Sequence, residues 1–233
     1  MLRIIKFGCK GERPVCKQVL NANCFHHNAQ LTKGGIRKYA THHSIIQRGQ
    51  RPKSAVEQLA IPLAFTAGVC GVSYLYTRWS KPPVPGSRLF PQLKPSHATL
   101  AVIIAMNGGV FLAWRLPQLA SVMGRYGVLD PARLRLPTLL TSAFSHMETA
   151  HLLINMLALW NIGGAVHDLI GRQNFLAFYV SSAAVSSFGS LAWQVLSRRP
   201  LHPSLGASGA ILGCLGFVGY VLPKYGFKRP LLT

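Results

Sequence analysis

The sequence has little charge, and acidic residues are especially rare. Of its 233 residues, 13% are charged, with five Asp and Glu against 25 Lys and Arg. Soluble domains typically contain about 25% charged residues. Because 49% of the residues are also hydrophobic, the composition argues against a soluble globule and favours a membrane protein with several spans.

The spacings typical of disulfide frameworks and zinc sites are also missing. The five cysteines form no CxxC pair and have no regular spacing. Cys70 and Cys214 lie in apolar runs, where cysteine is a small packing residue. The cysteines and histidines between residues 16 and 27 fit no common zinc pattern. The sequence therefore predicts no metal and no cofactor.

The net charge of +20 is unevenly distributed. Residues 1–53 hold 11 of the 25 Lys and Arg and a single acid, Glu12. No basic patch interleaved with aromatic residues appears, which argues against nucleic-acid binding. We therefore expect no nucleic-acid partner and interpret the charge as part of a targeting segment.

Residues 1–53 have the composition of a mitochondrial presequence, which is Arg-rich, acid-poor and amphipathic. From Arg3 to Lys17 the basic residues recur at steps of three and four, which places them on one helical face. The segment 37–40 (RKYA) resembles a matrix-processing site. A disordered basic tail is the alternative, and the lack of an apolar segment within the arm argues against a secretory signal.

Five apolar segments follow this arm. Four are about 20 residues long, enough to cross a hydrocarbon core of about 30 Å, whereas the fifth has about 15. The expected fold class is all-α, a polytopic transmembrane helix bundle. The segments cover residues 59–79, 98–117, 148–166, 173–196 and 208–222.

The pattern divides the chain into the basic arm 1–53, an extra span with a Pro-rich linker over 54–97, and a core bundle over 98–233. With five spans, the N-terminus and the connections 118–147 and 197–207 share one side of the membrane. The excess of Lys and Arg on that side predicts that it faces the matrix. The first of these connections is apolar, so we expect it at the membrane interface.

Two polar residues, His151 and Asn155, fall inside the third apolar segment. Because they are four positions apart, they differ by about 40° around a helix and face one direction. Polar side chains inside a span are costly without partners, which makes them functional candidates. Both carry N–H donors that can stabilise an oxyanion, and hydrogen bonding between helices is the alternative.

A zinc site in this region is excluded by its spacing. His146 and His151 resemble the ends of an HExxH motif, but they are five positions apart. On a helix that separation is about 140°, whereas the motif needs its histidines four apart on one face.

Ser208 begins the fifth segment, between Gly206 and Gly209. At a helix N-terminus the backbone N–H groups are unpaired and the helix dipole is positive, so negative charge on a substrate carbonyl is stabilised. The flanking glycines allow close approach of the backbone. Helix packing is the alternative, because glycine recurs at 209, 213, 216 and 219.

Taken in order, these motifs resemble those of the rhomboid family of intramembrane serine proteases, over roughly residues 98–222. The extra span and the basic arm narrow the resemblance to the mitochondrial, presenilin-associated rhomboid-like type. Trp114-Arg115 resembles the tryptophan–arginine pair that opens the family's first loop. Leu159-Trp160-Asn161-Ile162-Gly163 resembles the end of the family's second core helix. The other matching residues are Phe144-Ser145-His146, His151 with Asn155, and Gly206-Ala207-Ser208-Gly209.

This resemblance implies an enzyme of the mitochondrial inner membrane that hydrolyses peptide bonds in or near the transmembrane helices of its substrates. Its partners would be transmembrane protein substrates and the lipid bilayer. Ser208 would be the nucleophile, and His151 and Asn155, with the Ser208 backbone N–H, would stabilise the oxyanion.

One feature departs from the family. Its general base is a histidine on the sixth core helix, whereas no histidine follows His202 in this sequence. A serine without an adjacent base is a weak nucleophile. The sequence thus predicts either an incomplete chain of a protease or a non-catalytic rhomboid-fold protein that binds transmembrane helices. An unrelated membrane scaffold, whose glycines only pack helices, is the third interpretation.

Overall fold

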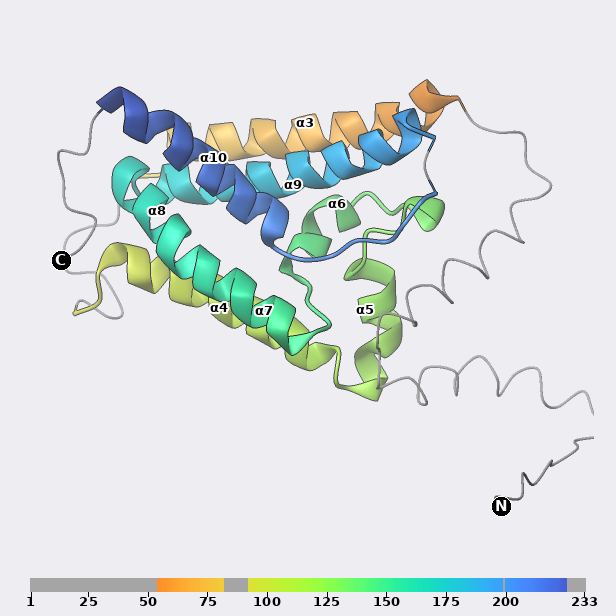
Figure 1. The fold of residues 1–233 in the computed structure, drawn as a ribbon, viewed down its shortest axis with the longest axis horizontal. Helices are drawn as coiled ribbons and strands as arrows, with labels where there is room; N and C mark the ends of the chain where they lie inside the picture. The colour runs from red at the N-terminus through yellow and green to blue at the C-terminus, as the bar shows by residue number, and fades with distance from the viewer. Residues whose placement is uncertain (1–53, 82–91, 199, 226–233) are drawn as a thin grey trace, which may run out of the picture.

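The computed structural model describes residues 54–81, 92–198 and 200–225, and for 222–225 the backbone only. The basic arm and its RKYA segment lie outside the described residues. Within them the protein is a bundle of helices that run along one another (Figure 1), so the all-α prediction is confirmed. Four are long and apolar enough to span a membrane, by length and composition: Ala55–Trp79 (α3), Pro95–Ala113 (α4), Thr149–Ile170 and Arg172–Leu196 (α9). A shorter apolar helix, Ser208–Tyr225 (α10), follows.

The helix boundaries follow local capping chemistry and differ from the predicted ones by a few residues. α3 begins at Ala55 because Ser54 and Glu57 form a capping box that satisfies two orphan N–H groups. α4 begins at Pro95, a favoured first helical residue, and ends at Ala113 instead of the predicted 117. α9 follows Gly171, whose φ of 80° breaks the preceding helix.

The third span is longer than predicted and irregular. Thr149–Ala158 (α7) continues through a π-helical turn, Leu159–Gly163 (η4), into Gly164–Ile170 (α8). Leu159 and Gly163 within this turn are buried, and Leu159 belongs to the main core with Leu100, Phe175 and Tyr179. Burial of these apolar side chains holds the third span against its neighbours.

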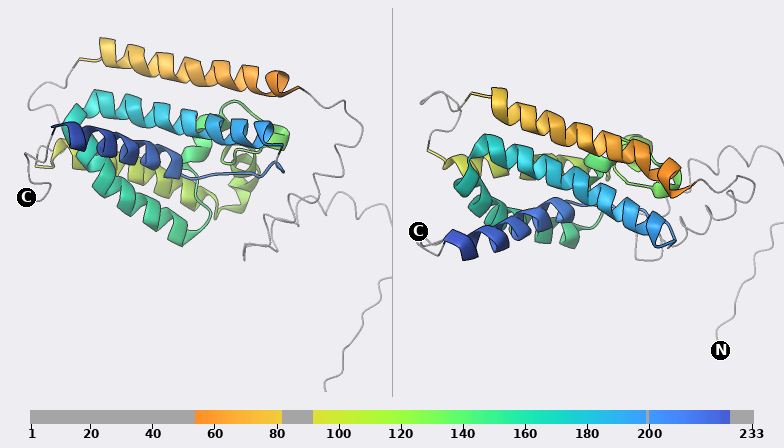
Figure 2. Two further views of the ribbon diagram at one scale, coloured as in Figure 1. Left: turned by 45° about the horizontal axis from the view of Figure 1, so that its top comes forward. Right: turned by 90° about the horizontal axis from the view of Figure 1, so that it is seen from above.

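α3 lies on the outside of the bundle, alongside α9 (Figure 2). Its inner face carries Pro62, Thr66 and Ser73, while larger apolar side chains such as Ile61 and Val72 are exposed on the bundle surface. That division is typical of a helix in lipid, where small and weakly polar residues form the helix contact and bulky ones face the acyl chains.

The connection between α4 and α7 contains further short helices rather than an irregular loop. It lies, with the turn after α9 and the start of α3, at one end of the bundle (Figure 1), as the parity of five spans predicts. Its elements are Pro117–Leu119 (η1), Ala120–Tyr126 (α5), Pro131–Arg133 (η2), Thr138–Thr141 (α6) and Ser142–Phe144 (η3).

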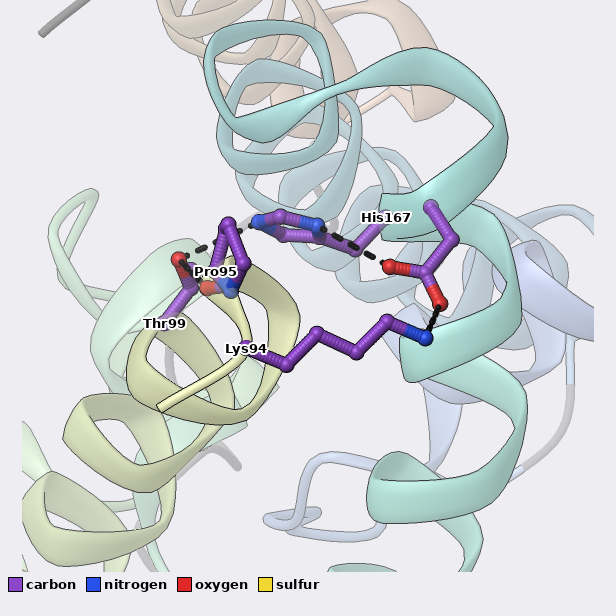
Figure 3. Close-up of polar contacts among 5 residues, drawn as sticks. Lys94, Pro95, Thr99 and His167 are labelled. Atoms are coloured by element: carbon purple, nitrogen blue, oxygen red, sulfur yellow. Dashed lines mark hydrogen bonds and ion pairs between the residues drawn. The ribbon is translucent and has the colours of Figure 1, made fainter. Parts of the chain in front are cut away.

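At the other end of the bundle, polar contacts join α4 to α8 (Figure 3). Lys94 Nζ lies 2.7 Å from Asp168 Oδ2, and His167 Nε2 lies 3.1 Å from Thr99 Oγ1. The Thr99 hydroxyl donates its one proton to the Pro95 carbonyl, so the imidazole is the donor in the second contact. The contact with Thr99 therefore satisfies Nε2 of the buried His167 and ties α8 to α4.

α9 and α10 pack closely where two glycines of α10 face two serines of α9. A Cβ on Gly209 would lie 2.1 Å from Ser186 Oγ, and one on Gly213 would lie 2.8 Å from Ser182 Cβ. A Cβ on Gly216 or Gly219 would meet nothing within 4 Å among the described residues. Within this part of the chain, close helix packing therefore accounts for Gly209 and Gly213.

We expect Gly213→Ala to destabilise the fold by about 1–3 kcal/mol, because its methyl would overlap the Ser182 Cβ. A change of side-chain rotamer cannot move that Cβ. Gly216→Ala is the matched control. It should leave stability unchanged or raise it by up to about 1 kcal/mol, because alanine favours a helix. Thermal unfolding of the detergent-solubilised variants measures both, and equal effects would show that Gly213 is not at a close helix contact.

Candidate functional site

The stretch that leads into Ser208 is bonded to the connection between α4 and α7. Ser204 and Leu129 exchange two backbone hydrogen bonds, each 2.9 Å long. Gly206 N–H donates to the Ser142 carbonyl at 2.9 Å. Three elements distant in sequence are thereby fixed relative to one another at the start of α10.

Gly206 is the residue of this stretch at which the geometry most clearly requires glycine. Its φ of 121° lies where side-chain-bearing residues are rarely found. A Cβ here would also lie 2.7 Å from Cε1 of the His151 ring. Backbone conformation and space therefore both require glycine, and the imidazole of His151 packs on the turn two residues before the serine.

Ser208 is the first residue of α10 and is exposed on the surface of the described bundle. The first N–H groups of the helix lack intrahelical partners there, and the dipole is positive. The Ser208 hydroxyl forms no hydrogen bond with an imidazole of the described residues. The hydroxyl is accessible, but no general base is positioned against it within this part of the chain.

Asn155 is buried, with 6% of its surface exposed, and lies one turn after His151 on α7. Its Nδ2 donates to the His151 carbonyl at 2.8 Å. Asn161 makes the same bond to Leu157, also at 2.8 Å, but its side chain is exposed. A carboxamide has two N–H groups, so Asn155 keeps a second donor while its orientation is fixed.

His146 completes the site, and the sequence reasoning assigned it no role. It is fully buried at 0% exposure, and its Nε2 accepts a hydrogen bond of 3.3 Å from Ala207 N–H, next to the serine. Its ring lies edge-on to that of His151, with centroids 5.0 Å apart. The sequence marks His146 only through its place in Phe144-Ser145-His146. Its spacing from His151 was compared with a zinc motif alone, and that comparison gave it no role.

The protonation state of His146 is fixed by its surroundings. Burial, and then the neighbouring His151, lower its pKa to about 4. At neutral pH the ring is therefore uncharged, and Nε2 has the lone pair that the Ala207 N–H requires. Among the described residues His146 Nδ1 has no partner, which makes it a buried donor beside the serine turn.

Comparison with known proteins gives the site a family context. Residues 133–226, which include His146, His151, Asn155 and Ser208, match the family model described as Rhomboid domain. The chain is 37% identical over 133 residues to the mitochondrial presenilin-associated rhomboid-like protein of Homo sapiens, covering 57% of this chain and 35% of that protein. It is 38% identical over 123 residues to Rhomboid protein 1, mitochondrial, of Saccharomyces cerevisiae, covering 52% and 36%.

A bacterial protease is also similar. Rhomboid protease GluP of Bacillus subtilis is 42% identical over 83 residues, covering 36% of this chain and 15% of that protein. The chain spans about a third of the length of the mitochondrial relatives, 35% for the human protein and 36% for the yeast protein.

The depressed pKa of His146 predicts acid sensitivity. Between its ordinary value near 6.5 and about 4, the unfolded chain binds a proton that the folded protein does not. Above pH 6.5 His146 is neutral in both the folded and the unfolded chain and costs no stability. As the pH falls from 6.5 towards 4, only the unfolded chain gains the proton, so the free energy of unfolding decreases. We expect the free energy of unfolding to drop by about 1–2 kcal/mol between pH 6.5 and 5 from this group.

The control is His146→Gln, whose side-chain oxygen can still accept from Ala207 N–H but does not titrate. Unfolding measured in detergent across this pH range should show a flatter profile for the variant. Parallel profiles for the two proteins would mean that His146 is not a buried neutral imidazole.

Proposed function

We propose that this chain, whose residues 133–226 match the family model described as Rhomboid domain, is an intramembrane serine endopeptidase of the rhomboid family. Its substrates are membrane proteins, cleaved in or near a transmembrane helix. Its place is the mitochondrial inner membrane, where the four candidate spans and the names of its mitochondrial relatives support a multi-pass protein.

The observation that carries this proposal is the placement of Ser208. It is an exposed hydroxyl at the N-terminus of an apolar helix, on a turn that three backbone hydrogen bonds and one to His146 anchor. A serine used only for helix packing would face a neighbouring helix, as Ser182 and Ser186 face α10. Ser208 instead points away from the packed core.

In the proposed reaction, the Ser208 hydroxyl oxygen attacks the scissile carbonyl carbon and passes its proton to a general base. Negative charge then develops on the carbonyl oxygen. The donors for it are the Ser208 backbone N–H, the free N–H of the Asn155 amide and the His151 imidazole. The adduct collapses as the base returns its proton to the leaving nitrogen, which releases the amine half of the substrate. Water then hydrolyses the acyl-enzyme, with its proton restored to the Ser208 oxygen.

A second function, a non-catalytic rhomboid-fold module that binds transmembrane helices, is favoured by one observation. Among the described residues no imidazole bonds to the Ser208 hydroxyl. Without a base the hydroxyl stays at its ordinary, weak nucleophilicity, whereas binding of a helix needs only the exposed apolar faces.

A fluorophosphonate probe separates the two functions, because it reacts with an activated serine and not with an ordinary hydroxyl. For the enzyme, the folded protein in lipid nanodiscs should be labelled, and Ser208→Ala should abolish the labelling. Ser121→Ala, at an exposed serine of α5, is the matched control and should label normally. Absence of labelling in folded protein would overturn the enzyme and leave the binding module.

The roles of Asn155 and His151 have a matched test on the same helix. Loss of one oxyanion donor typically lowers the rate by about 10²–10³. We expect Asn155→Ala and His151→Ala to slow probe labelling to that extent, with little change in thermal stability. Asn161→Ala, which removes the same bond to the helix backbone, should label at the normal rate. Equal effects of the two asparagine substitutions would mark Asn155 as structural.

A further inference from the structure

We infer that Trp114 and Arg115 form a clamp that positions His146 and, through it, the backbone N–H beside Ser208. This inference rests on the proposed function of Ser208 for its catalytic meaning but not for its geometry. The two residues directly follow the last residue of α4, Ala113, more than 90 positions before the serine in sequence. They are positioning residues, because neither touches the serine turn itself.

Trp114 holds the residue before His146. Its Nε1–H donates to Ser145 Oγ at 2.8 Å, and Ser145 is fully buried. The contact leaves no free volume: a Cβ on Gly127 would lie 3.0 Å from Ser145 Oγ and 3.3 Å from Trp114 Cζ2. The indole, the hydroxyl and the glycine therefore fix Ser145 from the end of α4 and the end of α5.

Arg115 holds the residue after His146. Its Nη2 donates to the Met147 carbonyl at 3.1 Å, and its guanidinium lies over the Phe111 ring, 4.6 Å from the centroid. The ring one turn earlier on α4 thus restricts the guanidinium to the orientation that reaches Met147. The two adjacent residues that follow α4 thus bond to the two residues that flank His146.

The position of His146 then sets that of the serine turn. Ser145 caps η3 through its N–H bond to the Ser142 carbonyl, at 3.1 Å. His146 and Met147 lie between η3 and α7, outside any regular helix, so helical hydrogen bonds do not hold them. His146 itself has one hydrogen bond, from Ala207 N–H, and that bond is long at 3.3 Å. A small displacement of the imidazole would break it, so the alignment depends on the clamp.

A purely local role for the clamp is the alternative. In that case the tryptophan and arginine would fix the end of α4 and nothing at α10. The two cases differ at one atom, the Ala207 amide hydrogen, whose bond partner is His146. The neighbouring Gly206 amide bonds to the Ser142 carbonyl and serves as an internal reference.

The test is amide hydrogen exchange, resolved to single residues, on the whole chain in nanodiscs. Trp114→Phe removes the donor and keeps an aromatic ring, and Ser145→Ala removes the acceptor. Each should raise exchange at Ala207 roughly fivefold, the effect of losing one hydrogen bond worth about 1 kcal/mol, and leave Gly206 and α9 unchanged. Because both remove the same interaction, the double variant should equal either single variant.

Trp79→Phe is the matched control, since Trp79 is 75% exposed on α3. Arg115→Gln should act like Trp114→Phe, and Arg115→Lys, which keeps a cationic donor for Met147, should restore part of the protection. Unchanged exchange at Ala207 in folded Trp114→Phe would overturn the inference, as would a loss of protection spread equally over Gly206 and α9.

Probe labelling of the same variants connects the clamp to Ser208. If Ser208 reacts, Trp114→Phe should slow labelling several-fold at a temperature where thermal unfolding shows the variant to be folded. If Ser208 reacts at the normal rate while Ala207 loses protection, the positioning role fails. Failure of every form to label would refute the proposed enzyme, and the exchange result would still decide whether the clamp exists.

Discussion

The need to bond the backbone of residues 201–207 determines the architecture around Ser208. This stretch is non-helical and leads directly into an apolar helix, where lipid offers its N–H and C=O groups no partners. Irregular backbone at membrane depth is tolerated only where protein surrounds it. Leu129, Ser142 and His146 supply those partners, and all three lie in the connection between α4 and α7. The connection is therefore bonded to this turn at three points, the bridge residue Leu129, Ser142 at the start of η3, and His146.

The same constraint explains why the His151 imidazole lies against Gly206. The N–H groups of the turn point towards the connection, whereas α10 runs in another direction. The positive φ at Gly206 produces this change in chain direction. The hydrogen in place of a side chain leaves room for the His151 ring, and the buried His146 ring packs edge-on behind it. Removing the charge from His146 by burial is thus a structural requirement, because a protonated Nε2 would repel the Ala207 N–H.

Much of this could be predicted from the sequence, because hydropathy and helix geometry act locally. The apolar segments, the start of α10 at Ser208 and the shared end of the two connections all follow from such rules. The π-helical turn at Leu159–Gly163 could not be predicted, since it depends on tertiary packing. The role of His146 was missed for a similar reason: a hydrogen bond between residues 61 positions apart leaves no periodic signal. The pairing of His151 with Asn155 as oxyanion donors stays a prediction.

The Asn155 amide shows how one structure can be compatible with both proposed functions. A bond to its own helix backbone is what a purely structural asparagine makes, and Asn161 makes it too. The difference lies in burial: Asn161 is exposed and needs no second partner, whereas Asn155 retains an N–H in a buried position, where an unused donor is costly. A carbonyl oxygen of a bound chain would satisfy it in either function. What distinguishes catalysis is a charge on that oxygen, and only a base at Ser208 can create it.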